Sequence, residues 1–215
     1  MPEFTVLATP DDVARAGADR IAAALAGGAR TFVLAGGTTP QRCYELLAAR
    51  TDVEWGRVTV LFGDERCVPP DDPESNYRMA REALLDRAAP ATVHRIVGEL
   101  GPVEAANAYD DIVARLAPLD VVVLGVGEDG HTASLFPGHP ELAADGWAVP
   151  VRDSPKPPPD RVSLTLPALR GARLVIVLAT GAGKADAVAK ARRGEVPSGM
   201  IASAKWLIDR AANGQ

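Results

Sequence analysis

The sequence has few cysteines and no long apolar run. Its 215 residues include only Cys43 and Cys67, which excludes a disulfide-stapled scaffold, and neither lies among other residues at a metal-ligand spacing. No charged segment followed by an apolar stretch opens the chain, and no apolar run approaches membrane-spanning length. We therefore expect a reduced, cytoplasmic protein that does not bind membranes.

An excess of positive charge is also missing. The net charge of -5 argues against a nucleic-acid surface, although an acidic protein can keep a local basic pocket for a small anion. The hydrophobic content of 47% over 215 residues is enough for a sizeable core and predicts a single domain over residues 1–215. The sequence leaves the oligomeric state open between a monomer and a small homo-oligomer.

Short β-branched runs alternate with amphipathic stretches along the whole chain. This alternation predicts an α/β fold, a three-layer doubly wound and mainly parallel sheet with helices on both faces. The expected strands cover residues 4–8, 31–35, 58–62, 93–97, 121–124, 161–166 and 174–178. The first expected helix follows residues 9–12. Others are expected at about 40–50, from near 75, at 103–116 and within 181–193. Residues 205–212 stay unassigned.

Residues 120–140 form the stretch around which the rest of the sequence is organised. The run 121–124 predicts a buried parallel strand, and glycines directly after it let the backbone turn tightly beside a ligand. Open α/β sheets bind ligands at the carboxyl ends of their strands. We therefore expect chemistry at three glycines and three titratable residues, namely Gly125, Gly127, Gly130, Glu128, Asp129 and His131.

Two nucleotide-binding motifs match only in part. Glycines within 125–130 fit the dinucleotide fingerprint, but that motif needs a long helix and residues 136–138, Phe-Pro-Gly, end any helix early. Lys184 follows glycines as in a P-loop, but Leu178 replaces the first glycine and Ala185 replaces the magnesium-binding hydroxyl. We reject both motifs and expect Lys184, at a helix start, to contact a single phosphate.

Glycines and hydroxyl residues follow the expected strand at 31–35. Gly36, Gly37, Thr38 and Thr39 combine flexible backbone donors with two hydroxyls at a helix N-terminus, which suits one phosphate group. The alternative is an ordinary capped turn with Thr39 as the N-cap. That alternative leaves both glycines and Thr38 unexplained.

Two other segments carry weaker signals. The charged run 64–66 is of a kind that is usually solvated, but its position after a strand favours a site. Residues 150–160 hold five prolines among polar residues and predict a surface excursion rather than a helix.

Four blocks resemble the signature motifs of the 6-phosphogluconolactonase family: LAGGTTP at 34–40, GDERCVP at 63–69 with SNY at 75–77, LGVGEDGHTASLFP at 124–137, and RVSLTLP at 161–167. The resemblance spans nearly the whole chain. It implies hydrolysis of 6-phospho-D-glucono-1,5-lactone to 6-phospho-D-gluconate in the oxidative pentose phosphate pathway, with a sugar-phosphate substrate and no cofactor. It also implies a fold related to glucosamine-6-phosphate deaminase.

The resemblance also implies roles for single residues. His131 would be the general base, and a neutral imidazole near its ordinary pKa can take a proton from water. Asp129 would orient the His131 ring or stabilise its protonated form. The substrate's phosphate would contact the loop of Gly36, Gly37, Thr38 and Thr39 together with Arg66 and Lys184. The sugar hydroxyls would contact Asp64 and Asn76, and Arg161 is a further candidate for substrate binding.

Two other functions fit parts of the pattern. An aldose-ketose isomerase or amino-sugar deaminase would use Asp64 as a carbon-acid base, but Arg66 stands where the deaminase relatives carry tyrosine. A non-catalytic sugar-phosphate sensor would need a partner or DNA-binding module, and nothing in the sequence supplies one. We expect no metal site, because Glu128, Asp129, His131 and His139 have no recognised ligand spacing.

Overall fold

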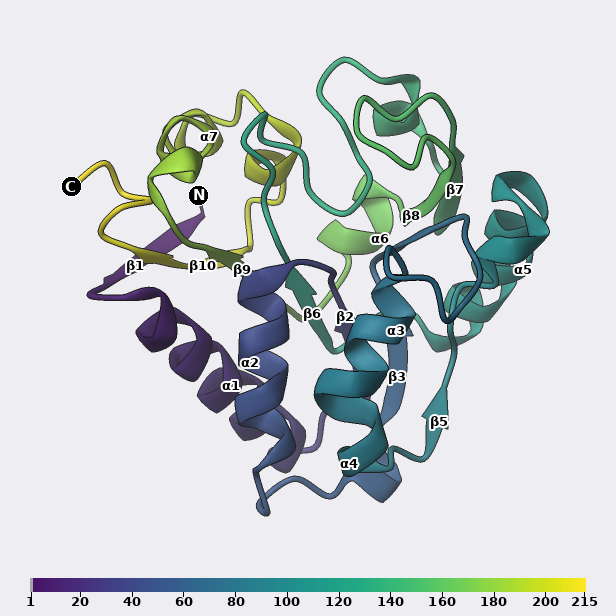
Figure 1. Ribbon diagram of the computed structural model, residues 1–215, viewed down its shortest axis with the longest axis horizontal. Helices are drawn as coiled ribbons and strands as arrows, with labels where there is room; N and C mark the ends of the chain where they lie inside the picture. The colour runs from purple at the N-terminus through teal and green to yellow at the C-terminus, as the bar shows by residue number, and fades with distance from the viewer. Residues whose placement is uncertain (1) are drawn as a thin grey trace.

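The computed structural model describes residues 2–215 (Figure 1). Its strands are β1 (Glu3–Leu7), β2 (Thr31–Leu34), β3 (Thr59–Phe62), β4 (Asp64–Arg66), β5 (Thr92–Val93), β6 (Val121–Leu124), β7 (Ala148–Val151), β8 (Arg161–Leu164), β9 (Leu174–Ala179) and β10 (Lys205–Asp209). The longer helices are α1 (Pro10–Ala26), α2 (Thr38–Ala48), α5 (Pro102–Leu116) and α7 (Ala185–Arg192). Shorter ones are α3 (Asn76–Ala80), π-helical η2 (Arg81–Leu85), α4 (Asp86–Ala88) and α6 (Leu166–Arg170), with 3₁₀ turns η1 (Trp55–Arg57), η3 (Gly98–Leu100), η4 (Pro140–Ala143), η5 (Ala182–Lys184) and η6 (Pro197–Met200).

The main sheet has seven strands in the order β1-β10-β9-β6-β2-β3-β5. Every neighbouring pair in it runs parallel. In Figure 1 helices α1, α2 and the segment α3–α4 lie below this sheet, and α6 and α7 lie above it. The predicted doubly wound α/β fold with helices on both faces is therefore confirmed.

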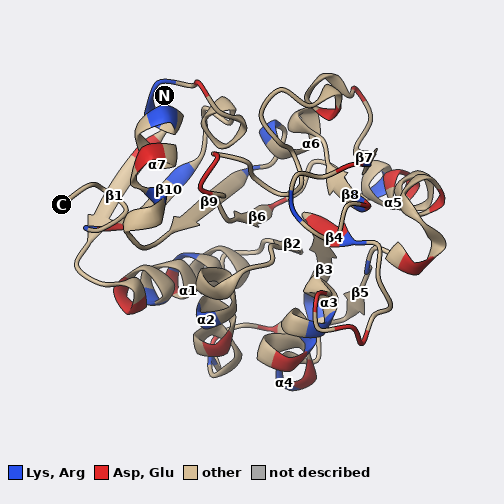
Figure 2. Ribbon diagram, turned by 45° about the horizontal axis from the view of Figure 1, so that its top comes forward, with Lys and Arg blue, Asp and Glu red and all other residues tan. Residues whose placement is uncertain are grey.

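The centre of the main sheet is apolar on both faces. All residues of β2 and β6 are buried, as are five of the six residues of β9. Figure 2 shows these strands without charged residues, whereas α4, α5 and α7 carry both signs. Because helices cover both faces of a parallel sheet, its strands are continuous apolar runs rather than alternating ones.

The strand order reverses between β2 and β6. From β2 the chain adds β3 and then β5 on one side, and it returns to place β6 on the other side of β2, followed by β9 and β10. A crevice forms outside the carboxyl ends of the strands at such a switch point, because the two following loops diverge. The loops concerned begin at Ala35 and Gly125.

A second, antiparallel sheet has the order β4-β8-β7. This sheet is not predicted from the sequence, because residues 64–66 are expected only as a charged run after a strand and residue 150, which lies in β7, is expected in a surface excursion. Strand β4 is three charged residues long and β7 contains Pro150, so neither has an apolar periodicity. The backbone N–H of Leu164 donates to Gly63 at 2.8 Å and thereby connects this sheet to the end of β3.

Several element ends differ from the prediction. Helix α1 begins as expected, with a capping box between Thr9 and Asp12. The expected strand at 161–166 ends at Leu164 because Thr165 caps α6, and the one at 93–97 shrinks to β5. The unassigned element at 205–212 contains strand β10. Within residues 2–215, none of the helices is long and apolar enough to cross a membrane.

Candidate active site

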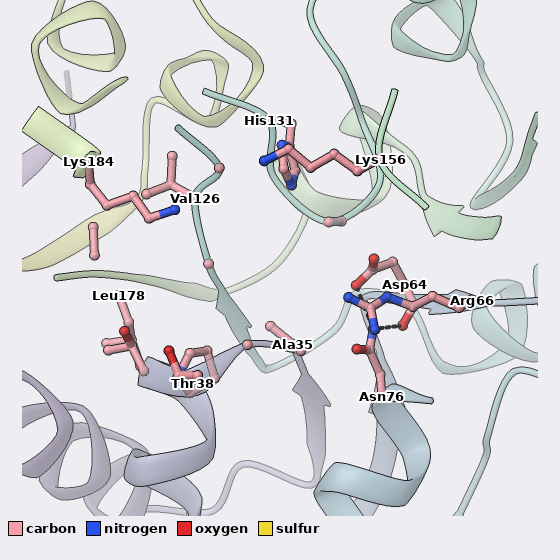
Figure 3. A pocket seen from close by; sticks show the side chains of 18 of the residues that line it. Ala35, Thr38, Asp64, Arg66, Asn76, Val126, His131, Lys156, Leu178 and Lys184 are labelled. Atoms are coloured by element: carbon pink, nitrogen blue, oxygen red, sulfur yellow. Dashed lines mark hydrogen bonds between the residues drawn. The ribbon is translucent and has the colours of Figure 1, made fainter. Parts of the chain in front are cut away.

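A cavity of about 320 Å³ opens at the switch point, and Figure 3 shows the side chains around it. It is lined by loops that follow β2, β6 and β9, by the second sheet and by the start of α3. Twelve of the predicted site residues line it: Gly36, Gly37, Thr38, Thr39, Asp64, Arg66, Asn76, Gly125, Gly127, His131, Arg161 and Lys184. Asp129 is outside the lining and contacts His131 directly.

The pair of His131 and Asp129 lies in the loop after β6. His131 Nδ1 and Asp129 Oδ1 are 2.6 Å apart, and the His131 backbone N–H donates to the same oxygen at 3.2 Å. The ring packs against Phe136 with 4.6 Å between centroids. A Cβ at Gly127 would overlap both side chains, so only glycine fits there. In the neutral tautomer favoured by this hydrogen bond, Nδ1 carries the proton and Nε2 is the acceptor.

The protonation states of this pair follow from burial and from each other. Burial lowers the pKa of His131, and the charge of Lys156 lowers it further, while Asp129 and Asp64 oppose the shift. Burial raises the pKa of Asp129, but the charge and hydrogen bonds of His131 outweigh burial, so the net shift is downward. At neutral pH the site therefore holds a neutral imidazole beside a carboxylate, which suits a general base.

Hydrogen bonds fix the loop that carries His131. Thr132 Oγ1 donates to the Gly125 carbonyl at 2.9 Å, and the Gly127 N–H donates to the His131 carbonyl at 2.9 Å. Gly130 has a φ of 87°, and a Cβ there would overlap Val196. The chain continues in turns rather than in a helix, so the rejection of a dinucleotide fingerprint is confirmed.

Asp64 and Asn76 form a buried polar corner with Ser134. Ser134 Oγ donates to Asp64 Oδ2 at 2.7 Å, and Asn76 Nδ2 donates to the Asp64 carbonyl at 3.0 Å and to Asp64 Oδ1 at 3.2 Å. A Cβ at Gly36 would overlap the Asn76 amide, so the loop after β2 lies directly against this corner. Ser134 joins the His131 loop to the second sheet.

Glu65 stabilises this polar corner through hydrogen bonds to the start of α3. Its carboxylate accepts the backbone N–H groups of Asn76 and Tyr77, each at 2.7 Å, and the Ser75 hydroxyl at 3.1 Å. Burial raises the pKa of Glu65 in spite of these bonds. The first turn of α3 is thereby attached to β4, which sets Asn76 beside Asp64.

Four cationic side chains line the cavity: Arg66, Lys156, Arg161 and Lys184. Within residues 2–215 none of them forms an ion pair with a carboxylate, in contrast to many cationic side chains elsewhere in the chain. Figure 3 shows Lys184 and Arg66 on opposite sides of the cavity. In a protein of net charge -5, this gathering of unpaired cations suits an anionic ligand.

The loop after β2 leads directly into α2. The N-cap is Gly37, with a φ of 103° and no side-chain cap, so the alternative of a turn capped by Thr39 is wrong. Thr39 instead shares a hydrogen bond of 2.7 Å with Thr180, in the loop after β9. Backbone N–H groups at such a helix start attract anions.

Lys184 lies at the N-cap of α7, as expected for a lysine at a helix start. Asp209, at the end of β10, accepts the backbone N–H of Gly181 through both carboxylate oxygens at 3.1 Å. This contact fixes the turn that leads from β9 to Lys184.

Several residues of the site are not predicted from the sequence. The segment 150–160 is largely exposed as predicted, but it brings Lys156 to the cavity. Ser134 and Glu65 contribute through buried hydrogen bonds to residues 70 and 11 positions away. No local pattern marks such contacts; the nearest signal is that Lys156 precedes a run of three prolines.

No group of three or more His, Cys, Asp or Glu side chains suited to a metal ion occurs within residues 2–215. The absence of a metal requirement stays a prediction, to be tested by chelation.

Comparison with known proteins places the chain among sugar-phosphate enzymes. A family model described as glucosamine-6-phosphate isomerases/6-phosphogluconolactonase matches residues 8–208. The 6-phosphogluconolactonase of Streptomyces coelicolor is 40% identical over 215 aligned residues, covering 87% of this chain and 82% of that protein. The structure of 6-phosphogluconolactonase from Trypanosoma brucei superposes with a TM-score of 0.88 at 29% identity, covering 100% of this chain and 98% of that one. A monomeric glucosamine-6-phosphate deaminase superposes with a TM-score of 0.83 at 20% identity, over 99% of each chain, which confirms the expected fold relationship.

Proposed function

The chain belongs to the family of glucosamine-6-phosphate isomerases and 6-phosphogluconolactonases, and we propose that it hydrolyses 6-phospho-D-glucono-1,5-lactone to 6-phospho-D-gluconate. This is a lactone-hydrolysing step of the oxidative pentose phosphate pathway. One observation carries the proposal: a His131–Asp129 pair shares one cavity with four unpaired cations and an uncapped helix start. A base beside an anion-binding surface is what hydrolysis of a phosphorylated lactone requires.

His131 activates water in the proposed mechanism. Water attacks the lactone carbonyl carbon while His131 takes its proton, and Asp129 stabilises the imidazolium that forms. When the tetrahedral intermediate collapses, the bond to the ring oxygen breaks and His131 returns the proton to that oxygen. A δ-lactone is already an activated ester, so the route needs no protein nucleophile, and the sequence contains no Gly-x-Ser-x-Gly elbow.

Other lining residues bind the substrate in this proposal. The phosphate contacts the loop 36–39 together with Lys184 and Arg66, which supply backbone donors, hydroxyls and positive charge. Asp64 and Asn76 face the sugar hydroxyls, for which carboxylate and amide oxygens are suitable acceptors. Remote phosphate binding orients the ring for attack.

We also propose a cytoplasmic location. Cys43 and Cys67 are both free, and Cys43 is buried. Burial raises the pKa of Cys43 to about 12 and that of Cys67 to about 11, so both thiols stay protonated and unreactive.

The deciding experiment measures hydrolysis of freshly made 6-phosphogluconolactone above its spontaneous rate, with glucosamine 6-phosphate assayed in parallel. We expect turnover of the lactone and none of the amino sugar. Deamination or isomerisation without lactone hydrolysis would instead support the use of Asp64 as a carbon-acid base. The hydroxyl and amide donors that Asp64 accepts from Ser134 and Asn76 favour a binding role over that one.

A further inference from the structure

The loop of residues 152–160 connects β7 to β8 and extends to the cavity. Its Lys156 lines the cavity together with His131, and the two side chains overlap in the view of Figure 3. The charge of Lys156 acts on both members of the pair, since it lowers the pKa of His131 and that of Asp129. Within residues 2–215 no carboxylate lies close enough to form an ion pair with Lys156, so its charge is available to a ligand.

Arg161 holds the backbone of this loop. Arg161 Nε donates to the Pro158 carbonyl at 3.1 Å, and Nη2 donates to the carbonyls of Lys156 at 3.2 Å and Pro157 at 2.9 Å. The residue is only 4% exposed; its guanidinium also makes a long hydrogen bond of 3.5 Å to Ser134 and lies over the Phe136 ring, 5.8 Å from the ring centroid. Three of its five N–H donors are therefore committed to the loop.

The loop is also tied within itself and to β4. The Ser154 hydroxyl donates to the Lys156 carbonyl at 2.9 Å, and the Ser154 N–H donates to the Pro159 carbonyl at 3.0 Å. The Cys67 N–H donates to the Asp160 carbonyl at 3.0 Å. The backbone of Lys156 is thus fixed, although its side chain is exposed at the cavity mouth.

We propose that Lys156 stabilises the negative charge that develops on the lactone carbonyl oxygen, and that Arg161 is a positioning residue that keeps Lys156 in place. This inference rests on the proposed lactonase function. As water bonds to the carbonyl carbon, the carbonyl π pair moves to its oxygen and the water proton passes to His131. Lys156 donates a hydrogen bond to that oxygen and keeps its own proton throughout.

The position of Lys156 distinguishes it from the other cations. The attacked carbon must lie next to the water that His131 activates, so the carbonyl oxygen lies near His131 as well. Lys184 and Arg66 lie on opposite sides of the cavity (Figure 3), whereas the charge of Lys156, which lines the same cavity, acts on His131. A cation whose backbone is already held beside the reaction stabilises developing charge with less reorganisation.

The first test replaces Lys156 by methionine, which has a similar length and no charge. With Lys156→Met we expect kcat to fall by about 10²-fold, the usual cost of removing one oxyanion donor, with little change in KM. Lys156→Arg should recover part of the loss. Lys190→Met is the matched control, since Lys190 pairs with Asp186 on α7 outside the cavity.

Unphosphorylated glucono-1,5-lactone separates this role from phosphate binding. Loss of an oxyanion contact reduces kcat/KM by the same factor for both lactones. A loss that appears in KM and only with the phosphorylated lactone would make Lys156 a phosphate ligand and overturn the proposal. If the wild-type protein did not hydrolyse the phosphorylated lactone at all, the proposed function itself would fail.

A second readout needs no activity. NMR titration of His131 in the substrate-free protein should give a higher pKa in Lys156→Met than in the wild type, because a repulsive charge is removed. The charged groups that act on His131 are Asp129, Asp64 and Lys156, and the first two are unchanged in this variant. An unchanged pKa of His131 would mean that Lys156 does not lie near this general base and would overturn the proposal.

The positioning role of Arg161 is tested by a double-mutant cycle. Arg161→Lys keeps the charge but cannot span three carbonyls, so kcat should fall while Lys156 is present. In the Lys156→Met background the same change should have no further effect on kcat. Thermal unfolding checks that the single and double variants are folded. Losses in kcat that add in the double variant would show that Arg161 acts independently of Lys156.

Discussion

The two ends of the central strands differ in how their charged residues are paired. The side of the sheet where these strands begin is called the amino edge, and the side where they end is called the carboxyl edge. At the amino edge Asp120 accepts the backbone N–H groups of Arg30 at 2.8 Å and Thr31 at 3.0 Å, and it pairs with Arg173 at 3.2 Å. At the carboxyl edge Asp64 accepts hydrogen bonds only from neutral groups, and four cations around it have no carboxylate partner within residues 2–215. The amino edge is satisfied by the protein itself, whereas the carboxyl edge leaves four cations available to an anionic ligand.

This difference follows from the topology. Residues 30, 120 and 173 each precede one of the neighbouring strands β2, β6 and β9, so a single carboxylate can join three strand starts. The loops after the same strands diverge at the switch point and enclose a cavity instead. Cations that lack partners there lower stability, a cost that is typical of a functional site.

The largest expected effect at the carboxyl edge comes from His131. His131→Asn should reduce kcat by about 10²- to 10⁴-fold, the usual contribution of a general base, with a much smaller change in KM. Burial holds the wild-type pKa of His131 below the ordinary value of about 6.5, so the ring is neutral at pH 7. Wild-type kcat should therefore be full above that pKa and fall as the pH drops through it, because the imidazolium cannot accept a proton.

Steady-state kinetics against pH measure both effects, and His94→Asn is the matched control outside the cavity lining. A folded His131→Asn protein with wild-type kcat would contradict the assignment. Detection of an acyl-enzyme adduct by mass spectrometry would contradict direct attack by water.

The next largest effect concerns the cations. Lys184→Ala and Arg66→Ala should each raise KM roughly 10- to 150-fold, with a smaller change in kcat. This corresponds to a loss of about 1.5 to 3 kcal/mol of charge-assisted binding free energy. Lys190→Ala, on the same helix as Lys184, and Arg57→Ala, which loses an exposed pair with Glu54, serve as controls.

Unphosphorylated gluconolactone sharpens this prediction. It should be a poor substrate, because the phosphate is not available to orient the ring. Replacing a residue that contacts the phosphate should then matter little for this lactone. Equal kcat/KM for the two lactones in the wild-type protein would remove the sugar-phosphate assignment.

At the amino edge the expected effect is on stability alone. Asp120→Ala leaves the backbone N–H groups of Arg30 and Thr31 without their partner and should lower the free energy of unfolding by about 1 to 3 kcal/mol. Urea unfolding measures this loss, and kcat and KM of the folded variant should match the wild type. A kinetic defect without a loss of stability would mean that the two edges are not separate in function.

The sequence was sufficient for the central strands of the main sheet and for most of the residues at their carboxyl ends. Apolar runs at β2, β6 and β9, each followed by glycines or hydroxyls, are local patterns that need no tertiary information. The family resemblance then supplied most of the candidate roles, and the fold brought twelve of the predicted residues to one cavity.

Contacts between distant residues were beyond such patterns. Thr39 was expected as a possible N-cap, but it bonds instead to Thr180, 141 positions away. Arg161 hydrogen-bonds to the backbone of the loop that brings Lys156 to the cavity, and no periodicity of the sequence indicates that contact. Strand β4 was missed because three charged residues become a strand only by pairing with β8.

The smallest expected effect is that of a chelator, which should leave activity unchanged. Of the candidate ligands at the carboxyl edge, Asp129 and His131 already bind each other at 2.6 Å, and His139 has Glu141 at 3.7 Å as its acidic neighbour. A zinc site would need three or four such groups converging on one point. In the proposed mechanism the neutral imidazole of His131 activates the water instead. Dialysis against a strong chelator, followed by lactone hydrolysis assays with and without added divalent ions, tests this. Activity that disappeared and returned with one divalent metal would mean that the carboxyl edge takes a cation as well as an anion, which its four unpaired cations do not favour.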